Sequence, residues 1–182
     1  MGGSKPTRQP HHPHHQTRGC DPARPGLERA HLPVAAGRLG LDAAESEYIE
    51  FGGQPAIVVR RYDRRVDSQS RLVRIHQEDL CQAMSVAPEQ KYEIDGGPGA
   101  VRILHLLRGS ARLEDGYGFL RYQAYNYLVG GFDTHAKNFS LLLVGRDVRL
   151  APMYDVASSY PYEGLNHGLP IDRRQTRPRV AH

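Results

Sequence analysis

A polar loop between a helix and a hairpin places the strongest constraint on how this chain can fold. An apolar segment over residues 122–129 predicts the end of a helix at Gly130-Gly131, because glycine commonly terminates helices. Residues 139–144 predict a short buried strand and residues 148–152 a second one, joined by a turn at 145–147. The intervening loop is therefore held beside a hairpin that folds back on itself.

Three polar residues in this region have a spacing that points to chemistry. Asp133 and Asn138 share the loop, and Asp155 follows the second strand of the hairpin. Protein kinases use an aspartate that orients the attacking hydroxyl, an asparagine five residues later on Mg²⁺, and a further aspartate on Mg²⁺. Phosphoryl transfer needs these groups because its catalysis is largely positioning and charge neutralisation. The spacing alone is a weak signal, so the interpretation depends on the flanking segments.

Length and charge describe one globular domain with basic ends. The 182 residues suffice for a single core of ordinary domain size. The formal net charge is +4, but residues 30–172 carry fifteen basic and eighteen acidic side chains, a balance of −3. Nucleic-acid binding by the folded part is therefore not expected. No apolar run approaches the length of a membrane span, so no membrane partner is expected.

The two cysteines, Cys20 and Cys81, indicate a reducing compartment. Cys20 falls in a segment rich in Pro, His and Arg, so a structural disulfide is not expected. The predicted location is the cytoplasm. The predicted organisation is a disordered tail at 1–29, the domain at 30–165 and a second disordered tail at 166–182.

The remaining elements follow from apolar periodicity and turn residues. Helices are predicted over 32–41, 76–84, 101–107 and 117–129, and strands over 46–51 and 56–62, with a turn at 52–55 and a charged loop at 63–71. Asp95 to Gly99 form a glycine-rich loop, for which a structural role is favoured over phosphate binding because no strand precedes it. Tyr125 and Tyr127 are expected to pack in the interior. The other predicted core residues are Ile57, Val59, Leu80, Ile103, Leu106, Leu107, Phe119, Tyr122, Leu128, Phe139, Leu141, Leu143, Leu150 and Met153.

Five segments in order resemble one known family. They are Ile57 to Arg64, Ile75 to Leu80, Lys91 to Gly99, Asp133 to Ser140 and Leu150 to Asp155. The sequence resembles the HipA-like serine/threonine kinases, the toxin half of bacterial HipA/HipB-type toxin–antitoxin modules, over about residues 34–162. The resemblance implies an α+β, protein-kinase-like fold with a small β-hairpin remnant of the N-lobe and a mostly helical C-lobe.

The same resemblance implies a site for ATP and Mg²⁺. Asp133 is implied as the catalytic aspartate, with Asn138 and Asp155 as the Mg²⁺ ligands. The hinge between the lobes is implied at Tyr62, where backbone groups read adenine. The full set of implied nucleotide-binding residues is Arg60, Arg61, Tyr62, His135, Ala136, Lys137, Asn138, Tyr154 and Asp155.

The sequence departs from the family pattern at positions that bear on the implied kinase activity. Arg60-Arg61-Tyr62 stands where the family usually has Glu-Arg-Phe, and Gly130-Gly131 stands where it has Gly-Asn. Residues 1–33 show no phosphate-binding loop and no ATP-anchoring lysine, since Lys5 lies in the predicted tail. The chain is therefore expected to be a truncated HipA-like protein with exposed apolar surface and poor solubility.

Partners and alternatives follow from the same resemblance. The expected partners are a protein substrate, such as an aminoacyl-tRNA synthetase, and a HipB-like antitoxin, with DNA contacted only through the antitoxin. One alternative is an inactive remnant that serves as a protein-interaction module. Another is a metal-dependent hydrolase that uses Asp133, His135 and Asp155. Taken alone, His135 could instead be a loop residue bonded to the backbone, and Lys137 a surface charge.

Overall fold

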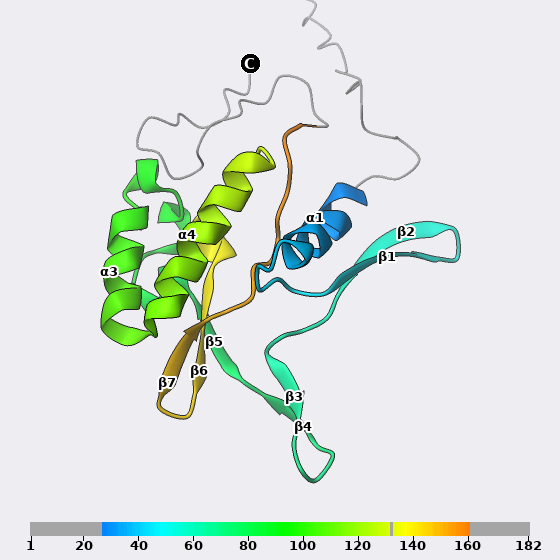
Figure 1. The fold of residues 1–182 in the computed structure, drawn as a ribbon, viewed down its shortest axis with the longest axis horizontal. Helices are drawn as coiled ribbons and strands as arrows, with labels where there is room; N and C mark the ends of the chain where they lie inside the picture. The colour runs from blue at the N-terminus through cyan, green and yellow to red at the C-terminus, as the bar shows by residue number, and fades with distance from the viewer. Residues whose placement is uncertain (1–26, 132, 161–182) are drawn as a thin grey trace, which may run out of the picture.

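The computed structural model describes residues 27–131 and 133–160, which form an α+β fold (Figure 1). The α-helices of this part are α1 (Leu27–Arg38), α2 (Leu80–Ala83), α3 (Ala100–Ser110) and α4 (Leu113–Leu128). Its 3₁₀ turns are η1 (Pro88–Gln90), η2 (Glu93–Asp95) and η3 (Ala136–Asn138). Its strands are β1 (Ser46–Phe51), β2 (Gln54–Val59), β3 (Arg64–Val66), β4 (Leu72–Arg74), β5 (His76–Asp79), β6 (Ser140–Val144) and β7 (Asp147–Leu150).

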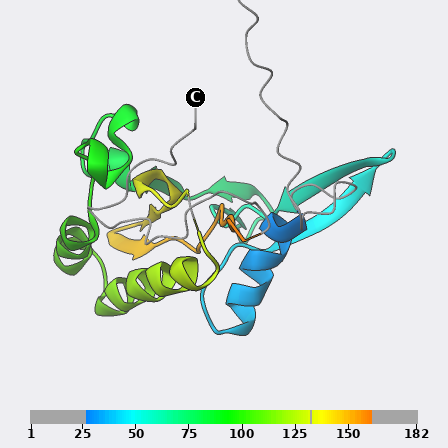
Figure 2. The ribbon, with the colours of Figure 1, turned by 90° about the horizontal axis from the view of Figure 1, so that it is seen from above.

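A three-stranded antiparallel sheet in the order β5-β6-β7 supports the polar loop. Leu141 in the central strand lies opposite Glu78 on one side and Leu150 on the other. Helix α4 packs along β7, and α3 packs against α4 (Figures 1 and 2). The rings of Phe119 and Phe139 meet edge to face, with their centroids 5.1 Å apart, and so join α4 to the sheet.

A buried carboxylate fastens α4 to the hairpin. Asp115, only 6% exposed, accepts hydrogen bonds from the Leu150 amide and from Arg149 Nε, both at 3.1 Å. It also accepts from the Arg112 amide at 3.1 Å, as in a capping box. The start of α4 is thereby tied to β7, which fixes where the loop after α4 meets the hairpin.

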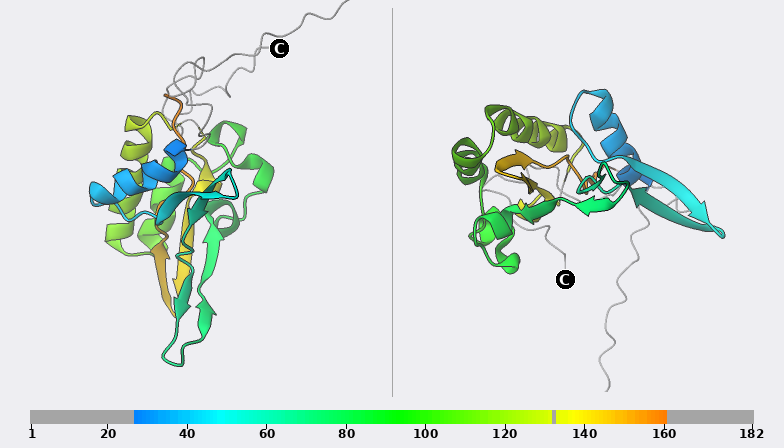
Figure 3. Two further views of the ribbon diagram at one scale, coloured as in Figure 1. Left: turned by 90° about the vertical axis from the view of Figure 1, so that its right-hand side faces the viewer. Right: turned by 90° about the horizontal axis from the view of Figure 1, so that it is seen from below.

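Two further hairpins extend from this body. β1 and β2 pair from Ser46↔Val59 to Phe51↔Gln54. Helix α1 packs against this hairpin, and the tip of the hairpin projects away from α3 and α4 (Figures 1 and 2). Gly52 and Gly53 at its tip both have positive φ, which is why glycine suits this tight turn. The β3–β4 hairpin continues past the end of β5 (Figure 3). The predicted strand 46–51 is confirmed. Of the turn predicted over 52–55, only Gly52 and Gly53 form the turn, because Gln54 and Pro55 already belong to β2, and the strand predicted over 56–62 ends at Val59.

The predicted helix over 76–84 is wrong in its first half. His76–Asp79 forms β5, and only Leu80–Ala83 is α-helical. Acidic and amide side chains suit a helix start locally, but the open edge of β6 offers backbone partners that a strand can satisfy. Asp79 instead serves as the N-cap of α2, where its carboxylate accepts from the Gln82 amide at 2.9 Å.

The charged segment 63–71, predicted as a loop, also contains a strand. β3 occupies residues 64–66, and Asp67 closes the turn that follows it by accepting from the amides of Gln69 and Arg71, each at 2.9 Å. A strand of three residues carries too little periodicity for a sequence pattern to reveal it.

Four predicted interior residues are exposed. Val59 is 47% exposed because the β1–β2 sheet has only two strands and an uncovered face. Leu143 is 36% exposed towards the outer end of β6, and Tyr127 and Leu128 are 52% and 68% exposed at the end of α4. Tyr125 is buried, as predicted. Of the other predicted core residues, Leu80, Ile103, Leu107, Phe119, Tyr122, Phe139, Leu141, Leu150 and Met153 are buried, and Ile57 and Leu106 are partly buried.

Apolar side chains are also exposed on the helices, as expected. Val101, Leu113 and Tyr117 are each more than 60% exposed, and a surface groove of about 320 Å³ runs between the packed helices α3 and α4. The predicted tails lie mostly outside the described residues, although residues 27–29 belong to α1. Within residues 27–131 and 133–160, no helix is long and apolar enough to cross a membrane.

Candidate kinase active site

The polar loop leaves α4 through two closely packed glycines. Gly130 has φ of +64°, the left-handed conformation that commonly follows a helix end. A Cβ on Gly131 would lie 3.0 Å from the backbone oxygen of Asn126, which accepts a hydrogen bond from the Gly131 amide at 2.6 Å. The chain returns after Asp155 and packs on this turn, because the Ser159 amide donates to the Gly130 carbonyl at 2.8 Å. The glycine pair therefore holds both ends of the site together.

Within the loop, Asn138 folds the chain back on Asp133. Its Nδ2 donates to the Asp133 carbonyl at 2.8 Å, and its own amide donates to the His135 carbonyl at 2.9 Å. Ala136, at the start of η3, is buried. The predicted loop residues are thus brought into one compact turn.

Residues from a distant segment complete the surroundings of Asp133. The hydroxyl of Tyr92 donates to Asp133 Oδ1 at 2.6 Å, and Lys91 Nζ lies 2.8 Å from His135 Nε2. The Ala136 amide also donates to the Lys91 carbonyl at 3.1 Å. The Asp133 side chain remains 39% exposed, so it is fixed on one side and open to a ligand on the other.

His135 is held as a neutral imidazole. It is 7% exposed, and burial lowers its pKa, as does the neighbouring Lys91 ammonium, against the opposing effects of Asp133 and Asp155. Because an ammonium can only donate, Nε2 accepts and the imidazole proton resides on Nδ1. That Nδ1 is buried and has no hydrogen-bond partner among the described residues.

Lys137 is tied away from Asp133. Its Nζ donates to Asp79 Oδ2 at 2.6 Å, and this hydrogen bond raises the pKa of Lys137. Asp79 caps α2, so the pair joins the loop to the end of β5. The Lys137 side chain therefore makes a structural contact, and its backbone carbonyl accepts a hydrogen bond from the Tyr154 hydroxyl.

Tyr154 brings the end of the hairpin onto the loop. Its hydroxyl donates to the Lys137 carbonyl at 2.7 Å and lies 2.7 Å from Ser140 Oγ. Its ring lies against that of Tyr62, with centroids 5.8 Å apart, and burial raises the pKa of both phenols. Tyr62, predicted at the hinge, is therefore connected to the loop through Tyr154.

Asp155 occupies a conformation that few residues adopt. Its φ is +51°, which is uncommon for a residue with a side chain and often found at functional sites. Its carboxylate is 51% exposed and pairs with Arg29 Nη1 at 3.0 Å. A cavity of about 110 Å³ adjoins it, lined by Arg29, Pro33, Ala44, Ser46, Ile57, Val59, Tyr154, Asp155 and Val156.

The side chains of Arg60 and Arg61 engage neighbouring acids. Arg60 pairs with the exposed Glu45 at 3.0 Å, and Arg61 donates to both oxygens of the buried Asp63 at 2.7 and 2.6 Å. The Arg60 amide also donates to the Glu45 carbonyl at 2.9 Å, so a nucleotide base at the predicted hinge would have to meet other backbone groups of this segment.

The oxygen atoms present suit Mg²⁺. Asn138 uses its Nδ2 within the loop and keeps Oδ1 for a cation, and the Asp155 carboxylate is half-exposed. Mg²⁺ is typically held by one or two protein carboxylates together with substrate phosphates and water. In the part of the chain that the structure describes, no three His, Cys, Asp or Glu side chains gather as a metal centre, so the hydrolase alternative gains no support.

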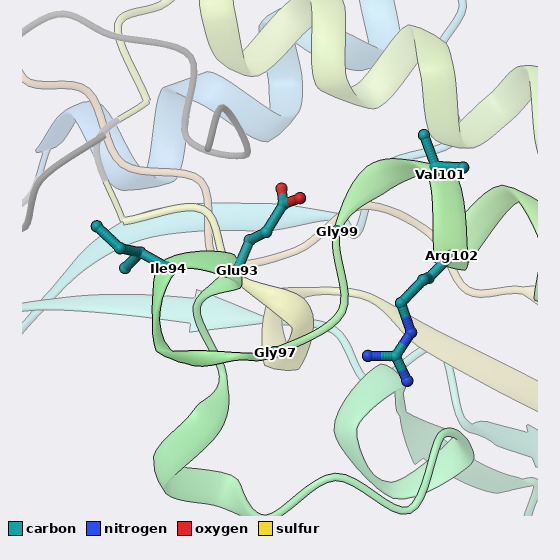
Figure 4. A pocket seen from close by; sticks show the side chains of 6 residues that line it. All are labelled: Glu93, Ile94, Gly97, Gly99, Val101 and Arg102. Carbon is teal, nitrogen blue, oxygen red and sulfur yellow. The ribbon is translucent and has the colours of Figure 1, made fainter. Parts of the chain in front are cut away.

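The glycine-rich loop lies beside this site and is shaped by packing. A Cβ on Gly97 would fall 2.1 Å from the Gln90 carbonyl, and one on Gly99 would fall 2.3 Å from the Glu93 carboxylate. A hollow of about 390 Å³ opens between Glu93, Ile94 and Arg102 (Figure 4). These close contacts favour the structural role predicted for the loop.

No sequence pattern predicts a role for Lys91 or Tyr92. Both belong to a segment that carried the family resemblance, but more than forty positions separate them from the loop. No local spacing connects them to Asp133, and only the tertiary fold brings them there.

Comparison with solved structures defines the class of fold. The chain superposes on HipA from the Shewanella oneidensis complex of HipA, HipB and operator DNA with a TM-score of 0.71 and 26% identity, over 79% of this chain and 37% of that one. It also resembles the Helicobacter pylori proinflammatory kinase CtkA, with a TM-score of 0.53 over 70% of this chain and 45% of that one. At 15% identity, the second likeness shows the fold alone. The fold is kinase-like and α+β.

The family follows from sequence comparison. The model of the HipA-like C-terminal domain matches residues 11–182, and the chain belongs to this family. It is 43% identical over 133 residues to Y4mE of Sinorhizobium fredii, a protein provisionally named as a kinase, covering 72% of this chain and 32% of Y4mE. It is 29% identical over 144 residues to the serine/threonine-protein kinase toxin HipA of Shewanella oneidensis, covering 72% of this chain and 33% of the toxin. The chain thus spans about a third of the length of these curated relatives.

Proposed function

We propose that this chain carries the catalytic loop of a serine/threonine protein kinase that transfers the γ-phosphate of ATP to a protein hydroxyl. The observation that carries the proposal is the fixed, half-open Asp133. Tyr92 holds its carboxylate, Asn138 holds its carbonyl, and one side of the carboxylate remains accessible. A carboxylate fixed in this way can orient a hydroxyl group and accept its proton.

Asn138 and Asp155 are the proposed Mg²⁺ ligands. The bound ion neutralises phosphate charge and fixes the position of the phosphates. Asn138 contributes its amide oxygen, and Asp155 exchanges its exposed ion pair with Arg29 for the cation. Exposed pairs of this kind contribute about 0–1 kcal/mol, so their loss is a small cost.

The hinge is proposed to receive the adenine base. Tyr62 and the backbone of Arg60 and Arg61 lie at the end of β2, near the cavity beside Asp155. His135, Ala136, Lys137 and Tyr154 shape the loop between that cavity and Asp133.

The biological setting is proposed from the relatives. The solved HipA neighbour was crystallised with HipB and operator DNA, which supports a HipB-like antitoxin as a partner and contact with DNA through it. A cytoplasmic protein substrate, such as an aminoacyl-tRNA synthetase, and growth arrest as the outcome belong to the same proposal.

One observation favours a second function, that of a binding module without catalysis. The cavity beside Asp155 measures about 110 Å³, whereas ligand pockets usually span about 300–1,000 Å³. In this structure, Arg29 also forms an ion pair with the Asp155 carboxylate that would have to bind Mg²⁺. Either the pocket opens for nucleotide, or the chain acts only through protein contacts.

Calorimetric titration of the purified chain with ATP in the presence of Mg²⁺ separates these functions. Wild-type protein is expected to bind, and Asp155→Asn is expected to weaken binding about tenfold or more, because a charged Mg²⁺ ligand is lost. Asp147→Asn is the matched control, since Asp147 is exposed and pairs with Arg112 at 3.3 Å on the opposite end of the hairpin.

A transfer assay then tests the catalytic residue. Asp133→Asn should retain Mg²⁺–ATP binding but reduce transfer of radiolabelled γ-phosphate to proteins of a bacterial extract by about 10²–10⁴-fold. A folded wild-type chain that binds no Mg²⁺–ATP would refute the kinase proposal. Co-purification with a HipB-like protein would then test the binding module.

A further inference from the structure

Lysine is rare in this chain and concentrated at the site. The sequence has 24 lysines and arginines, of which only Lys5, Lys91 and Lys137 are lysines. Both lysines in the described part of the chain reach the catalytic loop, Lys137 through Asp79 and Lys91 through His135. Lys137 is neutralised by its carboxylate partner, whereas Lys91 is paired with a neutral ring.

Several contacts fix the Lys91 ammonium. Its Nζ lies 2.8 Å from His135 Nε2 and 4.9 Å from the centroid of the Tyr92 ring. The Tyr92 and His135 rings meet edge to face with centroids 5.1 Å apart. The Lys91 carbonyl also accepts from the Ala136 amide, so main chain and side chain are both attached to the loop.

The ammonium lies close to the catalytic carboxylate. His135 Nε2 is 3.7 Å from Asp133 Oδ1. Because Lys91 Nζ lies 2.8 Å from the same Nε2, the distance from Lys91 Nζ to Asp133 Oδ1 is at most about 6.5 Å. This distance is shorter than the Debye length at physiological salt, so the two charges interact. Among the described residues, no arginine side chain forms an ion pair or hydrogen bond with Asp133 or His135. Lys91 is therefore the cation of this cluster.

The hydrogen-bonding chemistry leaves part of this cation unused. An ammonium has three donors, and the neutral His135 takes one of them. Lys91 is only partly buried, so its remaining donors can reach a ligand. A lysine ammonium is a compact positive charge that suits phosphate oxygens. A nucleoside triphosphate that approaches the carboxylates of Asp133 and Asp155 needs a positive charge to offset the repulsion between the negative groups.

We propose that Lys91 is a phosphate-contacting residue whose ammonium binds an oxygen of the terminal phosphate of ATP, with His135 as its positioning residue. This inference rests on the proposed kinase function. In the transfer step, the substrate hydroxyl oxygen bonds to the γ-phosphorus, the bond from that phosphorus to the β–γ bridging oxygen breaks, and the hydroxyl proton passes to Asp133. Lys91 offsets the negative charge on the transferred group and takes no proton.

A comparison of ATP with ADP tests the contact directly. Calorimetry in Mg²⁺ should show that Lys91→Met weakens ATP binding about 10- to 100-fold while changing ADP binding about twofold or less. Lys91→Arg keeps the charge and should restore part of the ATP affinity. Arg108→Met is the matched control, since Arg108 is an exposed cation of α3 away from the site, and it should change neither affinity.

The possible outcomes separate this inference from the proposed function. If wild-type protein binds neither nucleotide, both fail. If it binds ATP but Lys91→Met lowers the affinities for ATP and ADP equally, or lowers neither, only the phosphate contact is refuted.

A second variant checks the positioning contact. Because His135 Nε2 holds the Lys91 ammonium at 2.8 Å, His135→Ala should weaken ATP binding more than ADP binding, as Lys91→Met does. Equal losses of ATP and ADP affinity in His135→Ala would overturn the positioning role of His135.

Discussion

Asp63 offers the sharpest test of what holds the segment that we propose as the hinge. Its side chain is 1% exposed and accepts hydrogen bonds from Arg61 at 2.7 and 2.6 Å and from Arg64. Its carbonyl also accepts from the Ile75 amide at 2.8 Å, joining the hinge to the start of β5. Replacing Asp63 by Asn removes the charge but keeps the shape.

The expected loss follows from the pKa of this carboxyl group. The Arg61 hydrogen bonds, aided by Arg64 and opposed by burial, lower the pKa of Asp63 from 3.8 to about 2. A difference of this size corresponds to about 2.4 kcal/mol of folding free energy at neutral pH. Because Arg61 is 60% exposed and water screens the pair, we expect Asp63→Asn to lower the free energy of unfolding by about 1–2 kcal/mol.

The pH dependence has a defined sign. A lowered folded-state pKa gives stability that is present above the unfolded pKa of 3.8 and lost as pH falls through about 2. About half of the contribution should therefore be gone by pH 3. Urea unfolding followed by circular dichroism, at pH 7 and pH 3, measures the difference between wild type and Asp63→Asn.

A neighbouring pair supplies the control. Glu45 and Arg60 form a contact at 3.0 Å in the same segment, but their side chains are 72% and 78% exposed. Glu45→Gln should change the unfolding free energy by about 0.5 kcal/mol or less. If Asp63→Asn matched this control at pH 7, or if its deficit were equally large at pH 3, the reasoning would be wrong.

Two further changes probe the loop itself. Tyr92→Phe removes the hydroxyl that donates to Asp133 at 2.6 Å, so it should reduce the rate of phosphate transfer about tenfold or more. Calorimetry on the same sample should show unchanged Mg²⁺–ATP binding. Gly130→Ala places a Cβ on a residue with φ of +64° and 3.0 Å from Ser159 Oγ, so it should lower the free energy of unfolding, measured with heat or urea, by about 1–2 kcal/mol. Gly145→Ala is the control, since Gly145 has the same φ but no atom within 4 Å of the added Cβ, and it should lower the free energy of unfolding by less.

The local sequence was a good guide where chain neighbours determine the structure. The hairpin after the loop, the helix end at Gly130 and the turn at Gly52-Gly53 were predicted because glycine conformations and short apolar runs act over a few residues. The ordered segments that identified the family also placed Asp133, Asn138 and Asp155 in one region. Roles for these three residues remain predictions.

Tertiary structure decided the features that depend on distant partners. Residues His76–Asp79 have a helix-like composition, yet they form a strand because β6 presents an open edge. Val59 and Leu128 are apolar but exposed, because burial depends on which neighbouring element covers a face.

The sequence by itself determined the class of fold, and it predicted which loop residues would perform phosphoryl chemistry, because those residues share short spacings along the chain. Only the tertiary structure showed that Lys91 and Tyr92 reach His135 and Asp133, at 2.8 and 2.6 Å. A hydrogen bond between residues more than forty positions apart depends on the path of the whole chain between them. The charge around the proposed catalytic aspartate is therefore a property of the fold.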